Sequence, residues 1–353
     1  MSLKSRLEAE IAGGGPIGVA DYMFRCLHDP RDGYYATRPA IGPAGDYITA
    51  PQISQMFGEL IGLMLIEAWR ARDEPSPAIL AEAGPGDGTL MSDIARVARR
   101  ADAFLAACDV WLVEASAPLR AVQGARISGF PAAPRWAQSL AELPERAPLF
   151  LVANEFLDCL PARQFQRTAA GWAERVVGLD DAGALAFGLR PLSGDDGFPD
   201  AEPGAVFERS PAQEAVGSEL GARIADQGGV ALLIDYGRGL PGAGDTLQAL
   251  AGHRKVNPLA DPGRADLTMH VDFPAVLAAA KAAGAEVGVM TQGDFLRRLG
   301  IEARTEALAL SHPDRAEQLR RQLTRLTAPD QMGELFKVAA LWRGPPPAPF
   351  EAL

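Results

Sequence analysis

The sequence predicts an α/β protein built on a doubly wound, mostly parallel sheet. Three observations support this fold class. Short apolar strands alternate with segments of helical periodicity, several of these strands end at acidic or amide side chains, and 353 residues with 48% hydrophobic composition can bury a large core. That length corresponds to two domains or to one enlarged α/β domain.

The first elements can be assigned from hydrophobic periodicity and from capping and turn residues. Apolar side chains within 56–69 recur at helical spacing, and Ser54 stands where an N-cap is expected. A buried strand over 78–83 follows, and after a glycine-rich turn a helix occupies about 90–100. We expect residues 1–75 to form a helical segment that packs on the core.

Three further buried strands are expected, over 110–113, 149–153 and 230–234. In parallel sheets the ligand site lies beyond the carboxyl ends of the strands. Polar side chains stand at these ends, which makes them candidates for the site: Glu82, Glu114, Asn154, Glu155 and Asp235.

Two stretches interrupt the alternation of strands and helices. Residues 163–189 are rich in Phe, Trp and Val and contain two turn sequences, so we interpret them as antiparallel hairpins within an insertion at about 161–209. A helix capped by Ser210 follows. Residues 237–272 are rich in Gly, Pro and Asp, and we interpret this second insertion as a long loop that covers a site.

The C-terminal part of the chain completes the predicted core domain, which spans 76–343. Its last strand is expected over 335–342. The proline-rich segment that follows, 344–353, is expected to be a poorly ordered tail.

Composition excludes several classes of function. The formal net charge is −11 and no basic cluster is present, which argues against a nucleic-acid binder. Apolar runs are far shorter than the roughly 20 residues that cross a bilayer. Three widely spaced cysteines and four histidines show no metal-ligand spacing, so no metal is expected. Residues 1–10 lack a signal-peptide core and Arg greatly outnumbers Lys, so we expect a cytoplasmic protein of a GC-rich bacterium.

The most informative string is Glu82-Ala83-Gly84-Pro85-Gly86-Asp87-Gly88, at a strand-to-helix turn. Its glycines let the backbone approach a ligand closely. The dinucleotide fingerprint needs a glycine where Thr89 stands, so the spacing disfavours NAD and fits the turn that binds S-adenosylmethionine. The alternative is a tight connection with no ligand. The candidate cofactor-binding residues are Glu82, Gly84, Pro85, Gly86, Gly88, Glu114 and Asn154.

Two acids have distinct expected roles in this cofactor site. Glu114, at the end of the next strand, is placed to accept hydrogen bonds from both ribose hydroxyls. NAD sites use an acid in the same place, so Glu114 indicates a nucleoside without naming it. Glu82 can engage the ammonium group of the ligand, directly or through water.

The second informative string is Asn154-Glu155-Phe156-Leu157-Asp158. Glu155 and Asp158 are candidate catalytic carboxylates that would orient a cationic acceptor such as a guanidinium and accept the proton it loses. The alternative is that one or both merely cap the next helix. The string is not of the D/N-P-P-Y type that acts on nucleobases.

Some smaller features allow two interpretations each. Asp272 is an N-cap or a base, and His253 and His270 touch substrate or are simply solvated. The segment from Gly45-Asp46-Tyr47 to Gly58 forms one wall of the site or only the entry to a helix.

The chain resembles the MidA-like family, whose eukaryotic members are mitochondrial arginine methyltransferases that assist assembly of respiratory complex I. The resemblance runs over about 16–342 and includes Gly45-Asp46-Tyr47-Ile48-Thr49-Ala50-Pro51, Glu82-x-Gly84-Pro85-Gly86-x-Gly88, Asn154-Glu155-Phe156-Leu157-Asp158 and Ala265-Asp266-Leu267-Thr268. It implies a class I methyltransferase fold of seven strands, S-adenosylmethionine as donor, and an arginine of a complex I subunit as acceptor. Glu82 and the three glycines would match the cofactor turn, and Asn154 and Glu155 the motif after the strand.

We therefore predict an S-adenosylmethionine-dependent methyltransferase that acts on a protein arginine. Three alternatives stay open at this point. The protein could be a non-catalytic assembly factor that binds a partner as a scaffold, a methyltransferase for a small molecule, or an NAD-dependent enzyme.

Overall fold

A computed structural model describes residues 1–37, 48–192, 197–198 and 200–352. Its main sheet has the strand order β15-β16-β10-β5-β2-β3-β4, with the two-residue strand β14 paired to the end of β10. All neighbours in this order are parallel except at β16, which is antiparallel to β10 and β15. The strands are β2 (Ala78–Ala83), β3 (Cys108–Val113), β4 (Arg135–Ala137), β5 (Leu149–Asn154), β10 (Gly229–Arg238), β14 (Val271–Asp272), β15 (Glu286–Thr291) and β16 (Phe336–Trp342).

This topology confirms the predicted α/β class, and the seven strands of the main order match the seven-stranded sheet that the resemblance implies. The chain winds outward from β2 through β3 to β4, and then restarts at β5 and winds the other way through β10. The reversal falls between β2 and β5, which pair directly with each other. Ligands bind at such a switch point in doubly wound sheets, at the carboxyl ends of the strands.

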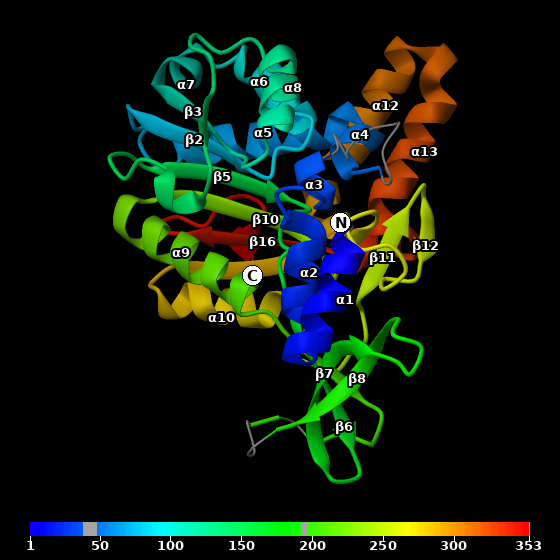
Figure 1. The fold of residues 1–353 in the computed structure, drawn as a ribbon. Coiled ribbons are helices and arrows are strands. Elements are labelled where there is room, and N and C mark those ends of the chain that lie inside the picture. Colours follow the sequence, from blue (N-terminus) through cyan, green and yellow to red (C-terminus); the bar gives the residue numbers. More distant parts are fainter. Residues whose placement is uncertain (38–47, 193–196, 199, 353) are drawn as a thin grey trace.

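Helices cover both faces of the main sheet (Figure 1). Because side chains alternate along a strand, Leu80 and Val152 pack on one face while Ala81 and Leu151 pack on the other. The first face carries α5 (Gln55–Arg70), α6 (Thr89–Ala98), α7 (Asp102–Ala107), α11 (Gln292–Arg298), α12 (Ile301–Ser311) and α13 (Ala316–Thr327), and the second carries α9 (Pro211–Gln227) and α10 (Phe273–Ala282). Helix α8 (Ala117–Arg126) follows β3.

The predicted helix starts are confirmed by their capping bonds. Ser54 Oγ accepts a hydrogen bond from the backbone N–H of Met56, and Ser210 Oγ accepts one from that of Gln213. Asp272 caps α10 in the same way, by accepting from Ala275. The structure therefore supports the capping interpretation of Asp272.

The first insertion, together with residues 17–18, forms a separate antiparallel sheet that extends away from the main one (Figure 1). This confirms the predicted hairpins. Helices α1 (Leu3–Gly14) and α2 (Val19–His28) bury Leu7, Met23 and Leu27 in a cluster that includes Val177 of this sheet. The strands are β1 (Ile17–Gly18), β6 (Arg163–Thr168), β7 (Gly171–Leu179), β8 (Leu185–Pro191) and β9 (Val206–Arg209).

The interpretation of the second insertion as a structureless loop is wrong. It contains β11 (Gln248–Ala251), β12 (Arg254–Val256) and β13 (Asp266–Thr268), which form a three-stranded antiparallel sheet. Gly252 and His253 join β11 to β12, and both have a positive φ, 56° and 60°. A two-residue turn of this kind matches the twist of a hairpin, and here it also accounts for His253.

The expectation of a poorly ordered tail is also contradicted. Phe350 lies in a short helix, η4 (Phe350–Ala352), and only 2% of its surface is exposed. Its ring lies 6.1 Å from the rings of Phe295 and Trp342. Arg72 also donates a hydrogen bond to the carbonyl of Pro345, so the burial of Phe350 and this bond hold the proline-rich segment on the core.

Within the described ranges no helix is both long and apolar enough to span a bilayer.

Candidate active site

The turn between β2 and α6 contains three glycines with a left-handed backbone. Gly84, Gly86 and Gly88 have φ values of 65°, 53° and 81°, a region that favours glycine. A Cβ on Gly84 would lie 2.9 Å from Cδ2 of Phe156. Pro85 lies between the first two glycines, and its carbonyl accepts the N–H of Gly88 at 2.8 Å. The left-handed backbone at three positions and the close approach of Phe156 therefore require glycine in this turn.

A cavity of about 730 Å³ opens beside this turn, at the carboxyl ends of the central strands. Its volume lies within the range of roughly 300 to 1,000 Å³ that holds cofactor-sized ligands. Gly84 and Gly86 line it after β2, Glu114 after β3 and Glu155 after β5. Four separate strand ends contribute, since Gln138 and Ser139 line it after β4.

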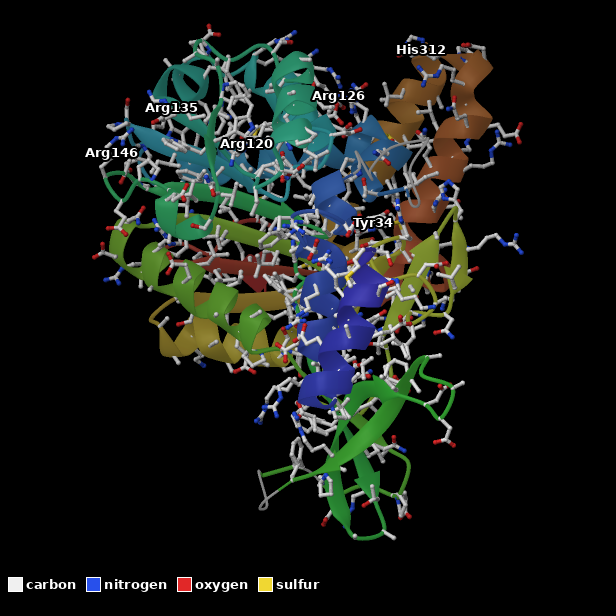
Figure 2. The ribbon with its side chains drawn as sticks, in the orientation of Figure 1. Tyr34, Arg120, Arg126, Arg135, Arg146 and His312 are labelled. Atoms are coloured by element: carbon white, nitrogen blue, oxygen red, sulfur yellow. The ribbon has the colours of Figure 1, made fainter. Side chains whose placement is uncertain are left out.

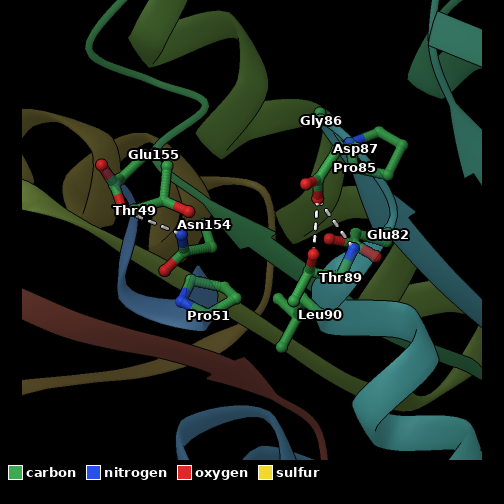
Figure 3. Close-up of a pocket in the computed structure, with 11 residues that line it drawn as sticks. Thr49, Pro51, Glu82, Pro85, Gly86, Asp87, Thr89, Leu90, Asn154 and Glu155 are labelled. Carbon is green, nitrogen blue, oxygen red and sulfur yellow. Dashed lines mark hydrogen bonds between the residues drawn. The ribbon is translucent and has the colours of Figure 1, made fainter. Parts of the chain in front are cut away.

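A smaller pocket of about 40 Å³ shares Gly84, Gly86 and Glu155 with the cavity. Figure 3 shows Asn154 and Glu155 on one side of it and Glu82 with the glycine turn on the other.

The segment before α5 forms a wall of this pocket. Thr49 and Pro51 line it, and Gln52 in α4 (Ala50–Ile53) donates a hydrogen bond from Nε2 to Oδ2 of Asp87 at 3.2 Å. This supports the wall interpretation for 49–52, whereas the predicted string Gly45-Asp46-Tyr47 lies outside the described residues.

Two buried acceptor atoms in the pocket lack hydrogen-bond partners among the described residues. They are Oε2 of Glu82 and Oδ1 of Asn154. An unpaired buried acceptor costs free energy, so both atoms call for a donor from a ligand. Burial raises the pKa of the Glu82 carboxyl to about 8. An ammonium group is a donor that such acceptors can bind, and the methionine part of S-adenosylmethionine carries one, so the residues present fit this cofactor.

Glu114 faces the cavity in a fixed geometry. Its Oε1 accepts the backbone N–H of Ser116 at 2.7 Å, and its Oε2 accepts Nε2 of Gln123 at 3.2 Å. The side chain is half-buried, and burial raises its pKa. It is therefore placed to hydrogen-bond a ribose, as the strand-end position suggests.

Gln123 is a site residue that sequence reasoning missed. It is fully buried in α8, and its Nε2 donates at 2.8 Å to the carbonyl of Gly86 as well as to Glu114. Its Oε1 accepts the indole N–H of Trp136 at 2.8 Å. Gln123 therefore ties the glycine turn to Glu114. The sequence carries no signal for this role, because glutamine in a helix is usually exposed.

One oxygen of Glu155 is fixed by two hydrogen bonds. Its Oε1 accepts the N–H of Ala50 at 3.2 Å and Nδ2 of Asn154 at 3.1 Å. No described residue donates a hydrogen bond to its Oε2, and the side chain lines both cavities. Burial and then the charge of Asp158 raise its pKa to about 8. The backbone φ of 52° is strained for glutamate, and such strain is typical of functional sites.

Asp158 lies outside both cavities. It is buried and lines neither cavity, and its carboxyl contacts the hydroxyl of Tyr236. Neighbouring Asp235 accepts the N–H groups of Leu157 and Asp158 through Oδ2, at 3.0 and 3.2 Å. Burial raises the pKa of both carboxyls, and the charge of Asp158 raises that of Asp235 further. Asp235 thus holds the turn after β5, while Glu155 alone of the two predicted carboxylates reaches the cavity.

The two histidines singled out by sequence lie away from these cavities. His270 packs edge-on against Tyr236, with ring centroids 5.5 Å apart, and His253 occupies the hairpin turn already described. Neither lines the cavity or the smaller pocket.

We expect the substitution Glu82→Gln to stabilise the cofactor-free protein at high pH. The folded-state pKa of about 8 lies above the ordinary value of 4.5. The uncharged Glu82 carboxyl therefore makes its full contribution to the free energy of unfolding below about pH 4.5. That contribution is lost as pH rises through about 8. Glutamine cannot ionise, so its unfolding temperature should exceed that of the wild type at pH 9 by about 4 °C or more, and the difference should shrink toward pH 5.

Thermal unfolding at several pH values measures this difference. Glu145→Gln is the matched control, because the Glu145 side chain is 75% exposed. If the unfolding temperatures of Glu82→Gln and Glu145→Gln followed the same pH dependence, the pKa of Glu82 would not be raised by burial.

The fold and this site define a class of protein. A doubly wound seven-stranded sheet with an antiparallel β16, a glycine turn after β2 and an acid after β3 are the features of a class I methyltransferase.

Comparison with known proteins identifies the family. Residues 60–291 match the profile of the Methyltransf_28 family, described as "Putative S-adenosyl-L-methionine-dependent methyltransferase". Protein arginine methyltransferase NDUFAF7, mitochondrial, of Bos taurus is 36% identical over 94% of this chain and 81% of its own length. Its Drosophila melanogaster homologue is 36% identical over 97% and 85%. A crystal structure from Burkholderia thailandensis, bound to S-adenosyl-homocysteine, matches with a TM-score of 0.86 and 32% identity, over 97% of this chain and 92% of that one.

The chain belongs to the MidA-like family of S-adenosylmethionine-dependent methyltransferases, and the resemblance noted from its motifs is confirmed. The predicted enzyme class and cofactor are confirmed with it.

Proposed function

We propose that this enzyme methylates an arginine side chain of a protein, specifically a subunit of respiratory complex I or its bacterial counterpart. The observation that carries the proposal is the Glu155 carboxylate, which lines the cavity that the glycine turn also lines and whose Oε2 accepts no hydrogen bond from a described residue. The relatives named protein arginine methyltransferase, mitochondrial, support the acceptor. We also propose that the protein acts in the bacterial cytoplasm, which cell fractionation would test.

The chemistry requires a base beside the acceptor. S-adenosylmethionine, when bound, supplies an electrophilic methyl group on its sulfonium sulfur. The accepting guanidinium nitrogen gains the methyl carbon and gives up one proton. Because the guanidinium pKa exceeds about 12, that proton is not lost to water beforehand. We assign this proton to Glu155 Oε2, because a base with a pKa near the working pH is well matched to this task.

Other residues hold the reacting groups in place. Asn154 Nδ2 and the N–H of Ala50 fix the Glu155 carboxylate, and Asp235 fixes the turn that carries it. Glu82 and Asn154 would hold the ammonium of the cofactor, and Glu114 its ribose. Alignment of this kind can supply a large part of the rate acceleration of a two-substrate reaction.

Mass spectrometry of proteins from cells with and without the gene tests the acceptor. We expect at least one methylarginine to be missing from the deletion strain and to return with the wild-type gene but not with Glu155→Gln. An unchanged set of methylarginines, in cells whose purified protein binds the cofactor, would contradict the proposal. It would favour a small-molecule acceptor or a scaffold role instead.

A further inference from the structure

One wall of the large cavity is aromatic. It comes from two helices that contain none of the predicted cofactor residues. His28 ends α2, and Tyr35 and Ala36 lie in α3 (Tyr34–Thr37). Figure 1 shows α2 and α3 beside the carboxyl ends of the central strands. Helix α9 also lines this cavity, through Ala215, Val216 and Glu219. An acceptor that enters here would lie between α9 and the aromatic side.

The rings of this wall form a continuous strip that reaches the surface. The centroids of Tyr35 and His28 are 5.9 Å apart, and those of His28 and Phe24 are 5.3 Å apart. Phe24 and His28 are four residues apart in α2, so they share one helix face. Phe24 is 55% exposed although it is a large apolar side chain. The strip thus runs from the cavity to open surface.

The inner end of the strip is held rigidly. The ring of Tyr34 is fully buried and packs edge-on against Tyr35 at 5.2 Å (Tyr34 is labelled in Figure 2). The Tyr35 hydroxyl donates a hydrogen bond to Oδ1 of Asp266 at 2.9 Å. A ring fixed from two sides loses little further freedom when a ligand packs on it.

The charge of the cavity favours a cation. Its described lining residues include Glu114, Glu155 and Glu219 and no lysine or arginine. Aromatic faces attract cations, and a guanidinium also stacks on them through its flat surface. Apolar side chains such as Phe156 and Val216 suit the methylene stem of the same residue.

We propose that Phe24, His28 and Tyr35 form an aromatic wall that binds the acceptor protein, with its target guanidinium held between Tyr35 and Glu155. Phe24 and His28 receive a second cationic side chain close to the target. The favoured partner is therefore a segment that carries neighbouring arginines and few acids. This inference rests on the proposed arginine acceptor and adds the surface that recognises it.

Peptide titration of the protein saturated with S-adenosyl-homocysteine tests the wall. The probe is the pentapeptide Gly-Arg-Gly-Arg-Gly, acetylated and amidated at its ends, and its neutral comparison replaces both arginines with citrulline. We expect the arginine peptide to bind at least tenfold more tightly than the citrulline peptide. Phe24→Ala and His28→Ala should each weaken it about fivefold.

Two substitutions of the same residue types, at sites outside the aromatic wall, serve as controls. Phe187→Ala removes another exposed phenylalanine, from β8, and His312→Ala removes an exposed histidine at the far end of α12 (Figure 2). Both should bind the arginine peptide as the wild type does. Equal affinity for the citrulline peptide, or wall variants that bind like their controls, would overturn the inference.

The outcomes separate this inference from the proposed function. If wall variants bind the peptide normally while a methylarginine still depends on the gene, the wall is wrong and the arginine acceptor stands. If no methylarginine depends on the gene and the citrulline peptide binds equally well, both proposals fail.

Discussion

The substitution Glu155→Gln is expected to lower the rate of methyl transfer by about a thousandfold, while the cofactor dissociation constant stays within about threefold of the wild type. Glutamine keeps an oxygen that can accept from Ala50 and Asn154, so the turn after β5 should hold its shape. The amide cannot take a proton from the acceptor. Turnover with labelled cofactor and calorimetric titration of the cofactor measure the two quantities separately.

The pH dependence of the wild-type rate gives a second test of this residue. A base acts only when ionised, and burial places the Glu155 pKa at about 8. The rate at saturating substrates should therefore fall about tenfold for each pH unit below that value, and the residual rate of Glu155→Gln should not follow this slope.

Asp158→Asn is the comparison variant, because Asp158 is buried, lies three residues away and lines neither cavity. We expect it to lose no more than about tenfold in turnover. If turnover and cofactor affinity fell together in Glu155→Gln, or if Asp158→Asn lost as much turnover, Glu155 would not be the base.

The sequence predicts the inner strands well and the outer ones poorly, for a physical reason. Every residue of β2 and β5 is buried, because helices cover both faces of the sheet there. Such strands appear in the sequence as uninterrupted apolar runs. By contrast β4 has only three residues, and β15 is mostly half-exposed, so neither gives a readable pattern.

The candidate site is predictable only where it follows from strand ends. Acids after parallel strands must meet at one edge of the sheet, so Glu82, Glu114 and Glu155 could be grouped in advance. Contacts across long sequence separations could not be foreseen. The hydrogen bond from Ala50 to Glu155 joins residues 105 positions apart, and the one from Gln123 to Gly86 joins residues 37 apart.

Spacing also could not decide which carboxylate of the second motif faces the cavity. The sequence ranks Glu155 first and Asp158 second as the acceptor-side carboxylate, but it does not show which side chain faces the cavity. The choice is made by the left-handed backbone at Glu155 and by Asp235, which holds the N–H groups of Leu157 and Asp158 from β10. Asp235 lies 78 residues further along the chain than Leu157, so its contact with this turn could not be foreseen.

The substitution Gly86→Val is expected to weaken cofactor binding at least a hundredfold while the protein still folds. Gly86 has a φ of 53° and lines both the cavity and the smaller pocket. A branched side chain there would occupy the space that the ligand needs and would strain a left-handed backbone position. Calorimetric titration with S-adenosylmethionine measures the affinity, and thermal unfolding measures the stability.

The strain must be separated from the blocked ligand, and the chain offers a matched glycine for this. Gly183, in the turn between β7 and β8, has a φ of 80°, and no atom lies within 4 Å of the point that a Cβ would occupy there. Gly183→Val should therefore cost stability of a similar size, of order 1–3 kcal/mol, without touching the cofactor site. If Gly86→Val bound the cofactor normally, or if Gly183→Val lost binding to the same degree, the glycine turn would not be where the cofactor lies.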